Sequence, residues 1–412
     1  MLFLFASLPL IFLHQWSHAR DAAAYIDGGT QIIEGENPYS DGVFRGGPFG
    51  AVFLSILFGK LPDFIQALLI LALSVVGVWL YLRTFVQRSI TSLFVCMIVV
   101  WSSADRTSLD TIQLTGLIMG LLGFINLRSS QIKNHRNTFS LFFISLSTAI
   151  LLDCKPHVVL PFLILITLQM RDFQLLKLSL ALLVAGHIYV GSYFGFNHLE
   201  NWVRLILRIG ENQKFEKFDG AAHNYWQIVT YFNQDLNNWW QAIPFMTYAS
   251  LLLVSMIFVR RLTLLGANAL AGVCIGMTSY THFYDFVPLV AILFIVMTKG
   301  HASLFKFGIS MFILLPQNWH SWGPLLGVFF TIMIFYLLQI MENEKVVKLG
   351  VSNLIREIVK LATIGILFYF CIQTLNGFLP LPGELIDAIT TTELYFLYVL
   401  MIFKNRKHLY LN

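Results

Sequence analysis

The segment Arg20–Pro48 reads RDAAAYIDGGTQIIEGENPYSDGVFRGGP, a polar and glycine-rich stretch in an otherwise apolar chain. Residues 1–16 before it are almost wholly apolar, and a long apolar run begins again at Phe64. A polar segment between two apolar ones is typical of a loop at a membrane surface. The sequence therefore predicts membrane-spanning helices arranged around this loop.

The composition supports the same prediction. Of the 412 residues, 57% are hydrophobic and 12% are charged, and the mean hydropathy is +0.71, whereas soluble domains carry about 25% charged residues. The apolar runs are continuous rather than alternating, which favours helices over barrel strands. We expect an all-α polytopic membrane protein with about 10 to 14 transmembrane helices. The runs lie near 1–16, 64–82, 89–102, 111–127, 139–154, 158–170, 175–195, 244–259, 262–280, 286–298, 303–316, 323–341, 358–375 and 393–403.

The basic residues set the expected orientation. With the N-terminus inside and the spans alternating, 18 of the 27 Lys and Arg residues fall in inner loops, and 18 of the 22 Asp and Glu residues face outward. This is the positive-inside pattern, and it makes both termini cytoplasmic. The net charge of +5 then reflects the inner loops, so we expect no nucleic-acid partner. Residues 1–300 are interpreted as the membrane core, with outer loops at 17–63 and 196–243, and residues 301–412 as additional helices.

Three short helices are expected on the outer side. Ala22–Gly35 has apolar points at helical spacing and a glycine at its end. The apolar segment Gly47–Gly59 is too short to cross a bilayer, so a half-membrane or interfacial helix is predicted there. Asn201–Ile209 has the pattern of an amphipathic helix in the membrane interface.

Asp21, at the start of the first of these helices, has two interpretations. A carboxylate near a low-dielectric wall can have a raised pKa and act as a general base. The same carboxylate could instead cap the N-terminus of the helix by accepting backbone N–H bonds. The spacing alone leaves both roles open.

Tryptophan is concentrated on the predicted outer side. Eight of the nine tryptophans, Trp202 among them, lie in outer loops or at the outer ends of apolar runs. Such residues form an aromatic belt at the headgroup level in many membrane proteins. Because only Trp79 lies elsewhere, an external aromatic site for a sugar or an apolar ligand tail is the second interpretation.

Three motifs carry a resemblance to a known family. The first loop contains Asp21, Tyr25 and the step Gly35, Asn37, Pro38, Tyr39; the second motif is Ala149–Pro161, with Lys155-Pro156-His157; the third is Ser279–Asp285. Together they resemble the bacterial polytopic GT-C glycosyltransferases of the GT87 type, which include polyprenol-phosphate-mannose-dependent mannosyltransferases. The family's Tyr-Pro-Pro step is replaced here by Phe44–Pro48.

The resemblance implies a GT-C-type helical bundle that transfers a hexose, mannose foremost, from a polyprenyl phosphate to a lipid-linked or polysaccharide acceptor. It implies an active site on the outer face of a bacterial inner membrane, in contact with membrane lipids. Asp21 would deprotonate the acceptor hydroxyl, and the displacement would invert the anomeric carbon. The residues expected at the donor lipid phosphate are Lys155, His157, His282 and Arg45. Those expected at the sugar or acceptor are Tyr25, Asn37, Tyr39, His223, Asn224, Tyr284 and Asp285.

Several alternatives remain open on the sequence. Lys155 either contacts the lipid phosphate or extends to the interface and pairs with Asp153. No metal or other cofactor is expected, because the acidic residues of the first loop are dispersed. A transporter or flippase of polyprenyl-linked sugars is the alternative function. The absence of a visible repeat and the crowding of charges at the outer rim favour the enzyme.

Overall fold

The computed structural model describes residues 20–40, 44–85, 113–131, 138–212 and 239–278, with isolated residues between 288 and 296 and between 392 and 411. These residues are helical, apart from loops and one isolated antiparallel bridge between Leu262 and Tyr410. The predicted all-α class is therefore confirmed for the described part of the chain. The helices are α2 (Arg20–Glu34), α3 (Pro48–Phe58), α4 (Asp63–Phe85), α6 (Gln113–Gln131), α7 (Thr138–Cys154), α8 (Pro156–Met170), α9 (Phe173–Phe194), α10 (Asn197–Asn212), α12 (Trp239–Phe258) and α13 (Leu264–Ile275), with the 3-10 turns η2 (Val259–Arg261) and η5 (Arg406–His408).

Two of the described helical segments are long and apolar enough to cross a membrane, Phe173–Phe194 and Ile243–Arg261. Large apolar side chains lie exposed along both, for example Val184 and Ile188 on α9 and Leu253 and Ile257 on α12. The predicted runs 64–82, 111–127, 139–154 and 158–170 are also helical.

Helices α4 and α6 are in close contact because glycines line their crossing. A Cβ atom added to Gly120 would lie 2.9 Å from the Cα of Gly77, and one added to Gly123 would lie 2.8 Å from the amide nitrogen of Tyr81. Small residues permit such close backbone approach in membrane bundles. The order of the contacts also shows that the two helices run parallel. The run 89–102, predicted to cross back between them, lies outside the described residues.

Two hydrogen bonds show the relative directions of α8, α12 and α13. The hydroxyl of Tyr248 donates to the carbonyl of His157 at the start of α8, and the Gln169 amide near the end of α8 donates to the carbonyl of Leu262. Helix α12 therefore runs parallel to α8, and α13 returns in the opposite direction. These relative directions agree with the alternating spans expected from the sequence.

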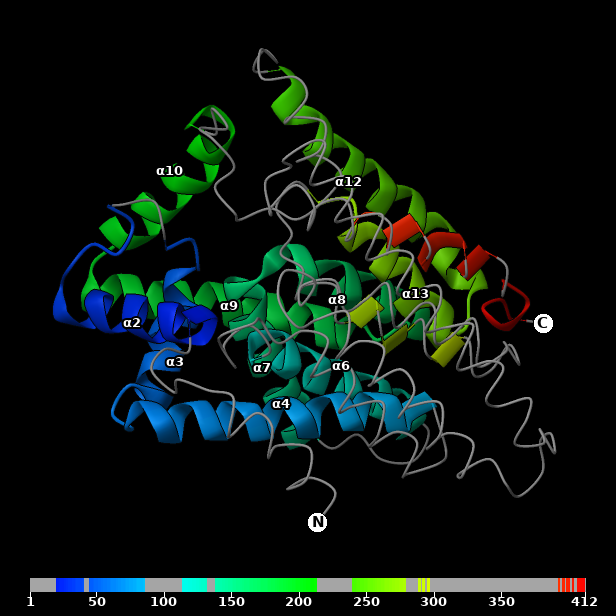
Figure 1. Ribbon diagram of the computed structural model, residues 1–412, viewed down its shortest axis with the longest axis horizontal. Coiled ribbons are helices and arrows are strands. Elements are labelled where there is room, and N and C mark those ends of the chain that lie inside the picture. The colour runs from blue at the N-terminus through cyan, green and yellow to red at the C-terminus, as the bar shows by residue number, and fades with distance from the viewer. Residues whose placement is uncertain are drawn as a thin grey trace, which may run out of the picture.

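A helical hairpin, α2 and α3, lies at one end of the bundle. Gly35, with φ +84°, ends α2 in a Schellman motif, in which the Gly35 amide donates to Ile32 and the Glu36 amide to Gln31. The hydroxyls of Thr30 and Ser55 lie 2.8 Å apart and join the two helices. Figure 1 shows α2, α3 and α10 gathered at the end of the bundle where α9 finishes.

The short helix α3 differs from the expected interfacial helix in its surroundings. Its bounds agree with the prediction, since Pro48 begins it at a position that needs no amide hydrogen. Its first turns, however, are buried among other helices, and Ile56 and Leu57 near its end are exposed. The start of α3 is therefore part of the protein interior.

Candidate functional site

The junction between α7 and α8 forms the centre of the site. Pro156 ends α7, because the residue before a proline is pushed out of the helical region, and Lys155 there has φ −134° and ψ 69°. Pro156 also begins α8. The side chains of Asp153 and Lys155 are both buried, with exposed fractions of 2% and 3%. Two ionisable side chains are thus held inside the protein within three residues.

The carboxylate of Asp153 caps α3. Its Oδ2 atom accepts a hydrogen bond from the amide of Gly50 at 2.8 Å, and the Asp153 carbonyl accepts from the amide of Gly47 at 3.1 Å. A carboxylate is a strong acceptor for the free amides of a first helical turn. A side chain on Gly47 would collide with this carboxylate. The close approach therefore requires glycine at this position.

The second carboxylate oxygen contacts α9. His187 Nε2 lies 2.9 Å from Asp153 Oδ1, and the imidazole stacks on the indole of Trp202 with ring centroids 5.6 Å apart and an interplanar angle of 26°. The Trp202 Nε1–H group donates to the carbonyl of Arg45 at 3.2 Å.

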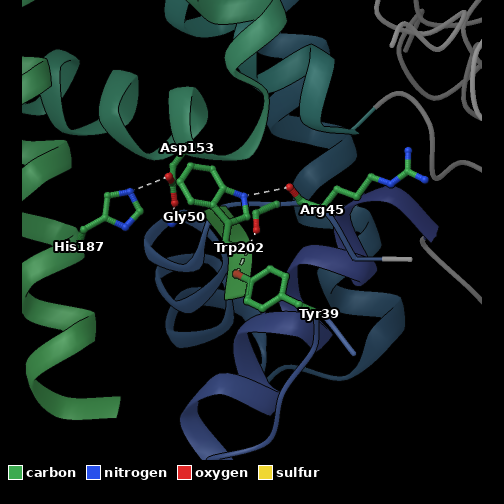
Figure 2. Close-up of polar contacts among 7 residues, drawn as sticks. Tyr39, Arg45, Gly50, Asp153, His187 and Trp202 are labelled. Atoms are coloured by element: carbon green, nitrogen blue, oxygen red, sulfur yellow. Dashed lines mark hydrogen bonds and ion pairs between the residues drawn. The ribbon is translucent and has the colours of Figure 1, made fainter. Parts of the chain in front are cut away.

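Arg45, Gly47, Asp153, His187 and Trp202 therefore form a closed circuit of contacts, here called the Asp153 ring. Figure 2 shows the carboxylate between His187 and Gly50, and the Arg45 side chain extending away from the other labelled residues. The two carboxylate oxygens of Asp153 therefore contact His187 and Gly50.

Two tyrosines fix the first loop by hydrogen bonds to backbone carbonyls. The Tyr25 hydroxyl donates to the carbonyl of Cys154 at 2.8 Å, and the Tyr39 hydroxyl donates to the carbonyl of Gly46 at 3.1 Å. The Phe44 ring lies between them, with centroids 5.7 Å from Tyr25 and 5.4 Å from Tyr39. The Asn37 side chain accepts from the Tyr39 amide and closes the turn. In these contacts Tyr25, Asn37 and Tyr39 shape the loop.

The pKa of the Tyr39 phenol is raised, first because burial disfavours the phenolate and then because Asp153 and Cys154, when ionised, repel it. Tyr39 is therefore a hydrogen-bond donor at any physiological pH. This fits its bond to the Gly46 carbonyl, which needs the proton.

The backbone of Asp21 lies in the first described turn of α2, one helical turn before Tyr25. Tyr25 of the same helix contacts the main chain beside Lys155, through the carbonyl of Cys154. His157 is half-buried at the start of α8. His223, Asn224, His282, Tyr284 and Asp285 lie outside the described residues.

Helix α10 is the predicted amphipathic helix, three to four residues longer at each end. Arg204 and Glu200 form an exposed ion pair one turn apart, while Trp202 and Leu205 pack on the core. His198 is buried, and its pKa is lowered by burial, an effect partly opposed by a hydrogen bond with the backbone of Phe194.

Asp153, His187 and Trp202 were not predicted as members of one site. A signal for the first two was present, because an aspartate and a histidine inside apolar runs are costly unless they are paired. The pairing itself joins residues 34 positions apart on neighbouring helices, which no local pattern reveals.

Among the described residues no group of three or more His, Cys, Asp or Glu side chains could hold a metal ion. The expectation of a metal-free reaction stays a prediction. No protein-family model matches this chain, and neither a curated protein nor a solved structure matches it.

Proposed function

We propose that this chain is a polytopic membrane glycosyltransferase of GT-C type, which transfers a hexose from a polyprenyl phosphate to a lipid-linked or polysaccharide acceptor on the outer face of a bacterial membrane. The observation that carries the proposal is the hydrogen bond from Tyr25 to the carbonyl of Cys154. Through it the helix that bears Asp21 is attached to the junction that bears Lys155. In the proposal, Asp21 on that helix is the general base and Lys155 at that junction is a phosphate-binding cation.

In the proposed reaction the carboxylate of Asp21 takes the proton of the acceptor hydroxyl. The acceptor oxygen then forms a bond to the anomeric carbon as the bond from that carbon to the phosphate oxygen breaks, with inversion. Polyprenyl phosphate leaves with the bonding electron pair. Cationic and hydrogen-bonding groups stabilise the charge that develops on a leaving phosphate, and we assign this role to Lys155, His157, Arg45 and His282.

The burial of Lys155 is consistent with this assignment. An ammonium group removed from water is unfavourable unless it meets anions or hydrogen-bond acceptors. The junction that carries Lys155 is bonded to α2 through Tyr25, and we assign the Lys155 ammonium group to the phosphate headgroup of the donor. The sugar and acceptor contacts proposed for Tyr25, Asn37, Tyr39, His223, Asn224, Tyr284 and Asp285 would surround it.

The test uses membranes that contain the full-length chain and a radiolabelled polyprenyl-phosphate hexose. Loss of a general base lowers the rate by roughly 10²- to 10⁴-fold, so Asp21→Asn and Asp21→Ala should transfer almost no hexose. Asp27→Asn, on the same helix, is the matched control and should retain wild-type transfer. If both Asp21 variants kept more than about a tenth of the wild-type rate, Asp21 would not be the base.

The same preparation tests the alternative, a transporter or flippase of polyprenyl-linked sugars. Reconstituted vesicles that move the labelled lipid to the opposite leaflet, without forming a glycosylated product, would support transport. The enzyme predicts product formation that depends on added acceptor.

A further inference from the structure

The Asp153 ring contains a buried carboxylate beside an imidazole, which simple packing does not explain. The Asp153 side chain is buried, and the His187 side chain is only 14% exposed. Burying a carboxylate against an imidazole costs desolvation energy, and apolar side chains of similar size often stabilise a fold as well or better. A carboxylate at this position therefore suggests a need for fixed geometry beyond filling space.

The ring fixes the backbone at two cationic residues, Arg45 and Lys155. Arg45 is itself a ring member, and its carbonyl is held by the Trp202 indole, while the next carbonyl, that of Gly46, is held by the Tyr39 hydroxyl. Lys155 follows Asp153 by two residues, and its amide still bonds to the carbonyl of Leu151. A displacement of the ring would therefore move the backbone of both cations.

We propose that Asp153 is a positioning residue that, through Gly47, Gly50, His187 and Trp202, fixes the backbone from which Arg45 and Lys155 reach the phosphate of the lipid-linked donor. This inference rests on the proposed function, since it concerns the donor of that reaction. Asp153 itself touches no reacting atom. Its effect is on how well the donor phosphate is bound.

Three substitutions separate the contacts of the ring. Asp153→Asn keeps an oxygen that can accept from Gly50 but removes the charge facing His187. His187→Phe keeps a ring that can stack on Trp202 but loses the contact with the carboxylate. Trp202→Phe keeps the stacking but loses the N–H group that bonds to Arg45. Tyr193→Phe on α9 and Glu200→Gln on α10 are matched controls, because both side chains are exposed and outside the ring.

The kinetic test measures KM for the donor and for the acceptor separately. Interactions that hold the donor in both ground state and transition state appear mainly in KM, so each ring variant should raise donor KM by roughly five- to tenfold. Acceptor KM should stay within about twofold of the wild-type value. A purely structural role would reduce the amount of active protein and leave both KM values unchanged, which would overturn the proposal.

A second measurement does not depend on sugar transfer. Amide hydrogen exchange of the detergent-solubilised full-length chain reports on the Gly47 and Gly50 amides in peptides covering residues 44–58. In Asp153→Ala, which removes the acceptor of the Gly50 amide, exchange at these amides should accelerate by about tenfold or more. In Asp153→Asn, which keeps an oxygen but loses the charge, exchange should accelerate less, and in Tyr193→Phe it should not change. Unchanged exchange in both Asp153 variants would show that the carboxylate does not hold the loop, and would overturn the proposal.

The two measurements distinguish the possible failures. Accelerated exchange with an unchanged donor KM would leave the ring as a structural contact and refute its positioning role. A wild-type chain that transfers no hexose would refute the proposed function and the positioning role with it. Accelerated exchange in the Asp153 variants would in that case show only that Asp153 stabilises the loop at Gly47 and Gly50.

Discussion

The hydroxyl of Tyr25 and the carbonyl of Cys154 meet at 2.8 Å although the two residues are 129 positions apart in sequence. This bond attaches α2 to the end of α7, at the point where the chain breaks for Pro156. The acidic start of the first loop and the lysine-proline step thus belong to one structural unit.

Removal of the Tyr25 hydroxyl should loosen that unit. Tyr25→Phe leaves the Cys154 carbonyl without its side-chain donor, and a lost hydrogen bond of this kind costs about 1 kcal/mol. We expect a lower thermal midpoint in detergent and faster proteolysis near residues 20–40. Ser40→Ala, which removes an exposed hydroxyl bonded within its own turn, is the control. Equal midpoints for Tyr25→Phe and the wild type would contradict the prediction.

The glycine at position 47 should tolerate no side chain. Gly47→Ala forces a methyl group against the Asp153 carboxylate, and such overpacking costs about 1–3 kcal/mol. Gly35→Ala provides the comparison, because nothing lies within 4 Å of its Cβ position and only its φ of +84° opposes the change. Thermal unfolding should therefore show both variants destabilised, and exchange at the Gly50 amide should accelerate only in Gly47→Ala.

The crossing of α4 and α6 should depend on Gly120. A methyl group there would lie 2.9 Å from the Cα of Gly77, so the helices must separate, and we expect Gly120→Ala to lose about 1–3 kcal/mol of unfolding free energy. Unfolding in mixed micelles with increasing SDS measures the loss. Phe124→Ala on the exposed face of the same helix should change it less, and the reverse order would refute close packing as the reason for the glycine.

The lowered pKa of His198 predicts how the docking of α10 depends on pH. Since burial disfavours the imidazolium, the folded state binds fewer protons than the unfolded state does below about pH 6.5. The stability that depends on the neutral ring is present above that pH and is lost as the pH falls further. The thermal midpoint of the wild type should therefore fall between pH 7.5 and 5.5, and His198→Gln should reduce that fall. Parallel pH profiles for the two proteins would exclude His198 as the cause.

Local patterns predicted much of the described fold. Long apolar runs became helices, α4, α7 and α9 among them, and Gly35 ends α2 as expected because only a glycine enters the left-handed region without strain. Helix α13 stops earlier than the predicted run 262–280. The Thr263 hydroxyl accepts from Gly266 and starts the helix, and Gly276 follows its last residue. An apolar run marks where a chain is buried or lipid-facing, and it does not mark where a helix must start and end.

The site was predicted less completely, for a physical reason. Asp21, Tyr25 and Lys155 lie in motifs whose spacing is visible along the chain. The pairing of Asp153 with His187, and the stacking of His187 on Trp202, depend on which faces of α7, α9 and α10 meet. Helices α7 and α9 are apolar along most of their length, and such helices offer many packing registers of similar energy.

The cap that Asp153 places on α3 also limits where an anion can bind. The free amides and the partial positive charge at the start of a helix are an ordinary docking place for phosphate, and α3 begins within the first loop. In this chain that end of the helix dipole is already neutralised by a carboxylate of the protein itself. An incoming phosphate would meet a negative charge there, so its affinity must come from cationic side chains elsewhere. Removal of the Asp153 carboxylate could therefore create an anion site at α3 that the wild-type chain excludes.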